Sequence, residues 1–94
     1  MKTIFTVTMV GSNSNRVVGW FDTYENAEEV VLKNVNDIQE HNYFFCVIEE
    51  INGNYPYPCP PKTEQWFRWY KKESKFRRVG KPEMHKHVVN FGIG

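Results

Sequence analysis

The amino-acid sequence predicts one small α+β domain, in which a main helix packs on one face of a mostly antiparallel sheet. Three observations lead to this prediction. A chain of 94 residues fits a single domain, residues 1–94, and does not fit two. Its apolar content of 40% and aromatic content of 16% are typical of a packed protein. Strand-forming residues dominate five segments, whereas helical spacing marks one main segment.

The first two elements are predicted to form an N-terminal hairpin. Residues 3–10 are mostly β-branched or aromatic, which favours a strand. Polar and small residues at 11–15 form a turn, and residues 16–21 read as the second strand. Gly19 lies inside that strand and indicates a bulge or a close approach of the backbone.

A helix is predicted to follow, starting at Asp22-Thr23. Thr23 suits the N-cap, and Glu25 lies in the first turn, where the helix dipole favours negative charge. Apolar residues recur at three- and four-residue steps on one stripe, which extends the expected helix to a last turn near 38–40. The stripe consists of Ala27, Val30, Val31, Val35 and Ile38.

The most apolar segment, residues 43–51, is predicted to be the central strand. Cys46 lies within it and is interpreted as a small buried hydrophobic residue. Residues 55–61 hold four of the five prolines, and a stiff connecting loop is expected there because proline lacks an N–H and restricts its neighbours.

The last predicted elements form a second hairpin. Residues 66–72 and 76–79 read as its strands, and 73–75 as its turn, which lacks the Asn-Gly signal that would define the turn type. A second, short helix is possible over 82–89, with Pro82 in its first turn. The predicted order is therefore β-β-α-β-β-β.

Charge is distributed unevenly along the chain. Residues 1–50 hold three Lys or Arg and eight Asp or Glu, a balance of −5, whereas residues 51–94 hold nine and three, a balance of +6. A basic half attracts an anionic ligand, and it equally attracts an acidic half of its own or a neighbouring chain.

The sequence favours a cytoplasmic protein without a membrane segment. The first ten residues lack the apolar core of a signal peptide, because Thr3, Thr6 and Thr8 interrupt it. No stretch approaches the roughly 20 apolar residues that a membrane helix needs. In a reducing cytosol, a disulfide between the two cysteines is not expected.

The second hairpin carries the candidate binding face. A three-residue turn at 73–75 would place Lys72 opposite Phe76 and Tyr70 opposite Arg78. The more apolar face of this hairpin would then pack inward with Phe67, Trp69 and Val79. The opposite face would present Trp66, Arg68, Tyr70 and Arg78 outward. A turn of two or four residues would instead move Arg77 to the face assigned to Arg78.

Aromatic rings interleaved with guanidinium groups can stack a base and hold a phosphate. Trp66 and Tyr70 are predicted to stack the base, while the cations bind phosphate. The candidate phosphate-binding residues are Arg68, Lys72 and Arg78. Tyr55 and Tyr57, from the proline-rich loop, would form a second wall. The structural alternative is a solvated sheet surface whose aromatic residues cover a thin core.

No residue set indicates an enzyme, a metal site or a cofactor. His85 and His87 lack the further ligands that zinc would need. Glu49 and Glu50 would point to opposite faces of a strand and so do not pair. We therefore predict no catalytic residue, no metal ligand and no cofactor.

Seven segments of the chain form a recognisable pattern: residues 18–22, 27–34, 37–38, 47–50, 55–58, 66–69 and 90–94. Together they resemble a family of short uncharacterised bacterial and phage proteins. This resemblance implies no activity and no site residues for this chain. In size, aromatic content and basic aromatic surface, the chain is also similar to compact phage proteins that oligomerise and sequester nucleotide messengers of host defence.

The leading hypothesis is a non-enzymatic, homo-oligomeric protein that binds an anionic nucleotide-like ligand, in the form of a phage-type protein that sequesters a defence signal. The alternative is an adaptor or inhibitor that contacts a host protein through exposed aromatic residues. A nucleic-acid-binding module ranks third, because the net charge is only +1.

Overall fold

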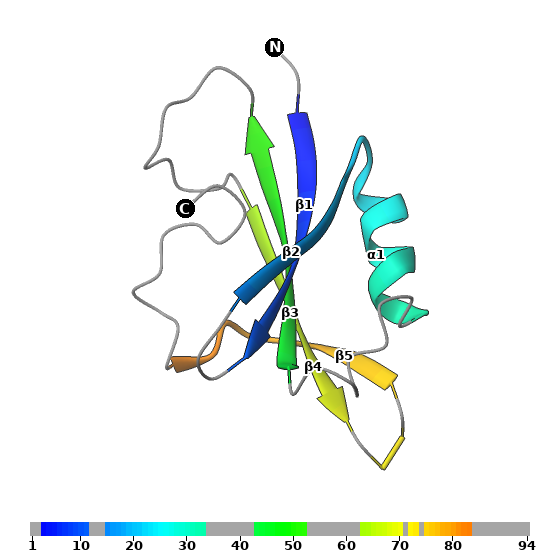
Figure 1. The fold of residues 1–94 in the computed structure, drawn as a ribbon, viewed down its shortest axis with the longest axis vertical. Helices are drawn as coiled ribbons and strands as arrows, with labels where there is room; N and C mark the ends of the chain where they lie inside the picture. Colours follow the sequence, from blue (N-terminus) through cyan, green and yellow to red (C-terminus); the bar gives the residue numbers. More distant parts are fainter. Residues whose placement is uncertain are drawn as a thin grey trace.

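The computed structural model describes residues 3–11, 15–33, 43–52, 63–70, 72–73 and 75–83. It confirms the α+β class, with five strands and one helix in the described chain (Figure 1). The elements are β1 (Thr3–Gly11), β2 (Asn15–Phe21), α1 (Tyr24–Leu32), β3 (Tyr43–Asn52), β4 (Thr63–Tyr70) and β5 (Lys75–Val79). The proline-rich loop lies outside the described residues, as does almost all of the segment where a second helix was expected.

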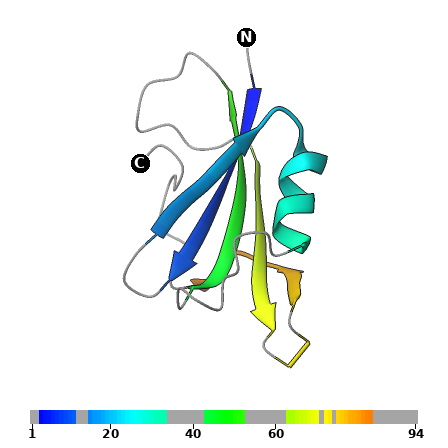
Figure 2. The ribbon, with the colours of Figure 1, turned by 45° about the vertical axis from the view of Figure 1, so that its right-hand side comes forward.

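The five strands form one antiparallel sheet in the order β2-β1-β3-β4-β5. β3 pairs with both β1 and β4, which confirms that the most apolar segment is the central strand. The sheet is strongly twisted, so that β2 and β5 run at a large angle to β3 (Figures 1 and 2). β2 and β5 are the two edges of the described sheet.

The N-terminal hairpin contains the irregularity predicted at Gly19. Val7 lies opposite Gly19, but the next residue, Thr8, lies opposite Val17, so Val18 is the extra residue of a β-bulge. The backbone at Gly19 closely approaches the Phe21 ring, because a Cβ atom there would lie 3.3 Å from two ring carbons.

α1 begins as its sequence predicts. Thr23 has an extended backbone, and its hydroxyl accepts a hydrogen bond of 3.2 Å from the amide N–H of Asn26. Glu25 lies in the first turn. The helix ends at Leu32, and the expected extension to 38–40 lies outside the described residues. Ala27 and Val31 are its buried residues.

The two faces of the sheet have separate apolar clusters. The larger cluster lies between the sheet and α1, where the helix residues pack on alternate residues of the strands. Its strand members are Val7, Met9, Cys46, Ile48, Phe67 and Phe76. Cys46 is buried, as predicted. The smaller cluster, on the opposite face, consists of Val10, Val47 and Trp66, with Phe45 and Val79 packed against it.

Candidate functional site

The register of the β4–β5 hairpin decides which side chains share a face. Arg68 lies opposite Arg77 and Tyr70 opposite Lys75, so four residues, 71–74, connect the strands. The predicted three-residue turn, with Tyr70 opposite Arg78, is therefore wrong. The four-residue alternative, which moves Arg77 onto the face of Arg68, is the one observed.

Burial of Phe76 accounts for this register. Phe76 lies opposite Trp69 on the helix face, where the two rings meet edge to face with centroids 5.2 Å apart. Phe76 is 4% exposed there, whereas the predicted register would have turned it outward. Burying a phenylalanine stabilises a fold by roughly 1.5–3 kcal/mol, which outweighs the weak preference of an unspecified turn.

Trp66 does not face solvent as predicted. It shares a face with Arg68 and Tyr70, but it is only 2% exposed. Its ring meets Phe45 edge to face at 6.2 Å between centroids, and its indole N–H donates a hydrogen bond of 3.0 Å to Glu64 Oε1. Val79 lies opposite Trp66, on this face, and not on the face of Phe67 and Trp69 as predicted. The Trp66 ring therefore belongs to the core of the sheet.

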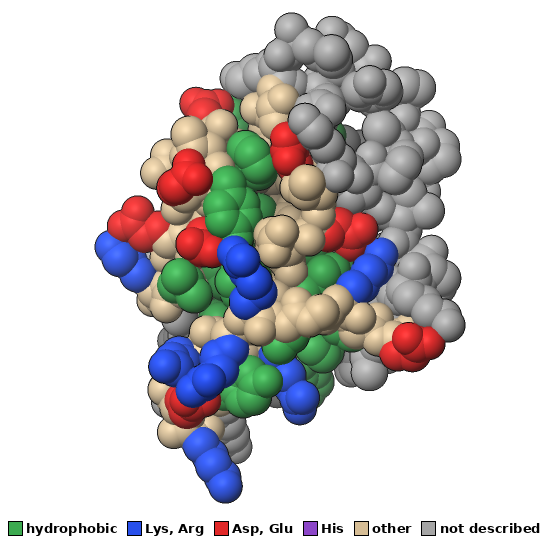
Figure 3. All heavy atoms as spheres, turned by 180° about the vertical axis from the view of Figure 1, so that it is seen from behind, with side chains coloured by type: hydrophobic (Ala, Val, Ile, Leu, Met, Phe, Trp, Pro, Cys, Tyr) green, Lys and Arg blue, Asp and Glu red, His purple; other side chains and the backbone are tan. Residues whose placement is uncertain are grey.

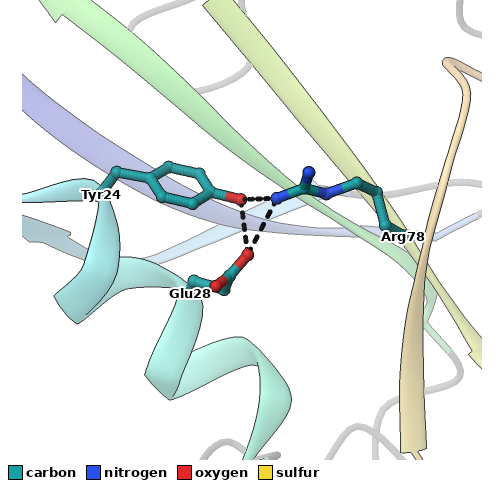
Figure 4. A network of polar contacts seen from close by, with 3 residues as sticks. All are labelled: Tyr24, Glu28 and Arg78. Carbon is teal, nitrogen blue, oxygen red and sulfur yellow. Dashed lines mark hydrogen bonds and ion pairs between the residues drawn. The ribbon is translucent and has the colours of Figure 1, made fainter.

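Arg78 lies on the helix face, opposite Phe67, and so faces away from Arg68. Its Nη2 donates hydrogen bonds to the phenol oxygen of Tyr24 at 2.6 Å and to Glu28 Oε2 at 3.0 Å (Figure 4). The Tyr24 hydroxyl in turn donates to Glu28 Oε2 at 2.8 Å. This network connects β5 to α1, so the structure gives Arg78 a tertiary contact in place of its predicted position beside Arg68.

Four side chains gather instead on the face opposite α1, near the hairpin turn. We call this group the Tyr70 cluster; it consists of Arg68, Tyr70, Lys75 and Arg77. The guanidinium carbons of Arg68 and Arg77 each lie 5.7 Å from the centroid of the Tyr70 ring. In Figure 3, which views the molecule from behind, Lys and Arg side chains gather at the lower end, where β4 and β5 are joined.

The electrostatics of the Tyr70 cluster are unbalanced. Arg68 and Arg77 carry like charges on directly opposite residues, an arrangement that destabilises a sheet unless something compensates it. The Tyr70 ring compensates in part through cation–π attraction. Arg77 also pairs with Glu73 in the turn. Among the described residues, Arg68 has no carboxylate partner.

Toward the other end of the same face, the sheet is polar but buried. Thr6 lies opposite Glu49, and Glu49 lies opposite Glu64 on β4. Glu49 is fully buried, and Lys81 pairs with Glu64 at 3.3 Å. In the described chain, the buried hydroxyl oxygens of Thr6 and Thr8 have no hydrogen-bond partner. The carboxylates at this end repel anions, so anion binding is favoured only at the hairpin end of this face.

The structure brings together two of the seven predicted site residues, Arg68 and Tyr70, and adds two that the sequence prediction did not include. Lys72 lies in the turn and is exposed. Tyr55 and Tyr57 lie outside the described residues. Arg77 was placed on this face only under the alternative turn of two or four residues, and Lys75 was not considered.

The described residues contain no group of three or more His, Cys, Asp or Glu side chains suited to a metal ion. α1, the helix of the described part, is too short to cross a membrane. No protein-family model matches this chain, and comparisons with curated proteins and with solved structures find no match. The function is therefore inferred from the geometry of the Tyr70 cluster.

Proposed function

We propose that this protein binds an anionic, nucleotide-like ligand without transforming it, and that the Tyr70 cluster is the binding site. The observation that carries the proposal is the directly opposed pair Arg68 and Arg77, with both guanidinium groups equidistant from one tyrosine ring. Two cations held side by side, of which only Arg77 pairs with a carboxylate in the described chain, favour the binding of a further anion.

The side chains of the cluster suit the two parts of a nucleotide. Guanidinium groups hold phosphate oxygens in a bidentate geometry, and Lys75 adds a further cation opposite Tyr70. Tyr70 is half-buried and offers an aromatic surface for a base, the role that the sequence prediction gave to Tyr70 together with Trp66. Lys72, in the adjoining turn, extends the positive surface.

The concrete form of this proposal is sequestration in the cytoplasm, as a phage-type protein acts on a defence signalling nucleotide. Arginine, lysine and tyrosine side chains hold a ligand through charge and stacking. We also propose that the protein is a homo-oligomer, because its acidic and basic halves complement each other between copies. Light scattering on the purified protein measures this directly.

Calorimetric titration tests the proposal. Nucleoside monophosphates, diphosphates, cyclic mononucleotides and dinucleotides are titrated into the wild-type protein, together with a short single-stranded oligonucleotide. Arg68→Gln is expected to weaken binding of the preferred nucleotide. Arg16→Gln removes an exposed arginine from the opposite edge strand, β2, and serves as the matched control that leaves binding unchanged.

Wild-type protein that binds no member of the panel would exclude this function. Tighter binding of the oligonucleotide than of any free nucleotide would favour a nucleic-acid-binding module instead, and its affinity would fall steeply with salt.

Exposed apolar side chains favour a second candidate function, an adaptor or inhibitor that contacts a host protein. Trp20 is 59% exposed and lies near the exposed Val17 on the same face of the edge strand β2. Trp is a frequent energetic anchor of protein interfaces. Under this alternative, Trp20→Ser abolishes capture of a stoichiometric host protein and Arg68→Gln does not. Under the nucleotide-binding proposal, Arg68→Gln lowers the affinity for the ligand and Trp20→Ser does not.

A further inference from the structure

We infer that the Tyr70 cluster prefers a terminal phosphate dianion to a phosphodiester, and that Glu73 is the internal anion that such a ligand displaces from Arg77. This inference rests on the proposed function, and it specifies the ligand class and the residue that sets the affinity.

The preference follows from the spacing of the two arginines. Directly opposite residues in an antiparallel pair have Cβ atoms about 4.5–5.5 Å apart, so the Arg68 and Arg77 guanidinium groups can reach one phosphate group together. Their equal distances to the Tyr70 ring, 5.7 Å, show that both side chains already extend along the same side of the sheet. Together they carry two positive charges.

Charge matching then separates two classes of phosphate. A terminal phosphate ester carries about −1.5 to −2 at pH 7, which balances both arginines, and it offers three free oxygens. A phosphodiester carries a single negative charge and has two free oxygens. It leaves one of the two opposed guanidinium groups uncompensated, so its binding removes less of the repulsion between them.

Glu73 occupies part of this site. Its carboxylate Oε1 accepts a hydrogen bond from Arg77 Nη2. Its backbone N–H donates to the carbonyl oxygen of Tyr70 at 3.1 Å, so the main chain of the turn is held while the side chain is exposed. A phosphate that binds both arginines takes the place of this carboxylate.

Glu73 is ionised when the ligand arrives. The hydrogen bond from Arg77 lowers the pKa of Glu73 from its ordinary value, and the positive charge of Lys75 lowers this pKa further. The carboxylate is therefore an anion at neutral pH. Because the Glu73 side chain is exposed, its displacement leaves no buried charge.

The test compares AMP with 3′,5′-cyclic AMP, which share a base and a ribose but differ in phosphate charge. Calorimetry at fixed ionic strength is expected to show AMP bound roughly two- to five-fold more tightly by the wild type, the range of one exposed ion pair. Glu73→Gln is expected to tighten AMP binding by a further two- to five-fold, roughly. It should tighten cyclic AMP binding less, because the carboxylate that it removes repels the more highly charged AMP more strongly.

Glu29→Gln is the matched control. Glu29 forms the same type of exposed pair, four residues from its partner Lys33, but it lies on α1 and not in the hairpin. It changes the net charge by the same amount as Glu73→Gln, and we expect it to leave both affinities unchanged. Far-UV circular dichroism confirms that each variant is folded.

The outcomes separate this inference from the proposed function. Wild-type protein that binds neither nucleotide nor any other member of the panel overturns both. Binding that depends on Arg68 but is equal for AMP and cyclic AMP, or is unchanged by Glu73→Gln, leaves the function standing and overturns the inference. An equal gain from Glu29→Gln also overturns it, because the effect would then be one of net charge.

Discussion

The guanidinium group of Arg78 on β5 donates a hydrogen bond of 2.6 Å to the phenol oxygen of Tyr24 on α1, 54 residues earlier in the chain. Glu28 accepts hydrogen bonds from both side chains, and Arg78 also lies over the Tyr24 ring at 6.0 Å. This contact holds the helix against an edge strand of the sheet (Figure 4).

Tyr24→Phe is expected to lower the free energy of unfolding by about 0.5–1 kcal/mol, because the hydroxyl bridges Arg78 and Glu28. The ring and its edge-to-face contact with Phe5, at 6.2 Å between centroids, remain. Thermal denaturation should show a fall in Tm of roughly 2–8 °C for a domain of this size. Unchanged stability would mean that water replaces the network without loss. Nucleotide binding at the Tyr70 cluster, on the other face, should not change.

Thr23→Ala should cost about 1 kcal/mol of stability, within a usual range of roughly 0.5–2, since the amide of Asn26 loses its acceptor at the start of α1. Thr23→Ser keeps a hydroxyl at the N-cap and is expected to retain most of the stability. Urea denaturation of the two variants measures the difference. Equal midpoints for Ala and Ser would show that the cap contributes nothing.

Trp66→Phe should destabilise the protein by roughly 1–2 kcal/mol without changing its affinity for nucleotides. The substitution leaves space in the cluster with Val10 and Val47 and removes the indole donor from Glu64. Calorimetry at a temperature where both proteins are folded, combined with urea denaturation, separates the two effects. A loss of affinity at unchanged stability would instead assign Trp66 to the ligand, as the sequence alone had suggested.

Burial raises the pKa of the Cys46 thiol from about 9 to about 12. In the unfolded chain this thiol loses its proton near pH 9, whereas in the folded protein it stays protonated up to about pH 12. The unfolded state therefore binds fewer protons in this interval, and stability should fall by about 1.4 kcal/mol per pH unit from this group. Below about pH 9 the contribution is fully present.

Cys46→Ala is the control for this prediction. The variant should lose that part of the pH dependence, while the rest of the pH dependence is common to both proteins. Urea denaturation at several pH values from about 8 to about 11, an interval that crosses the unfolded-state pKa of the thiol and stays below its folded-state pKa, measures both curves. Parallel curves for the wild type and Cys46→Ala would contradict the assigned cause.

Local patterns in the sequence were enough to predict most of the elements. Alternating β-branched and aromatic residues predicted β1 and β3, because strand propensity acts over a few residues. Thr23 predicted the start of α1, because an N-cap needs only its own side chain and an amide three residues on. Gly19 predicted a bulge or a close backbone approach for the same local reason, and both are observed.

The residues of the candidate site could not be predicted from local patterns, because they depend on the register of the β4–β5 hairpin. Arg68 and Tyr70 were identified from their spacing, but their neighbours required the hairpin register. A shift from three to four turn residues exchanges Arg78 for Arg77 on this face, and residues 73–75 carry no strong turn signal.

The sequence by itself therefore determined the α+β class, the approximate positions of the strands, the N-cap and the concentration of positive charge in the second hairpin, since each depends on residues close together in the chain. The strand predicted at 66–72 is β4, which runs from Thr63 to Tyr70. Only the tertiary structure decided which of these charges meet. Burial of Phe76 against Trp69 set the register, and it placed Arg77 beside Arg68 while Arg78 turned to Tyr24 and Glu28 on α1. Burial depends on the whole packed sheet, so the hairpin sequence alone could not predict this register.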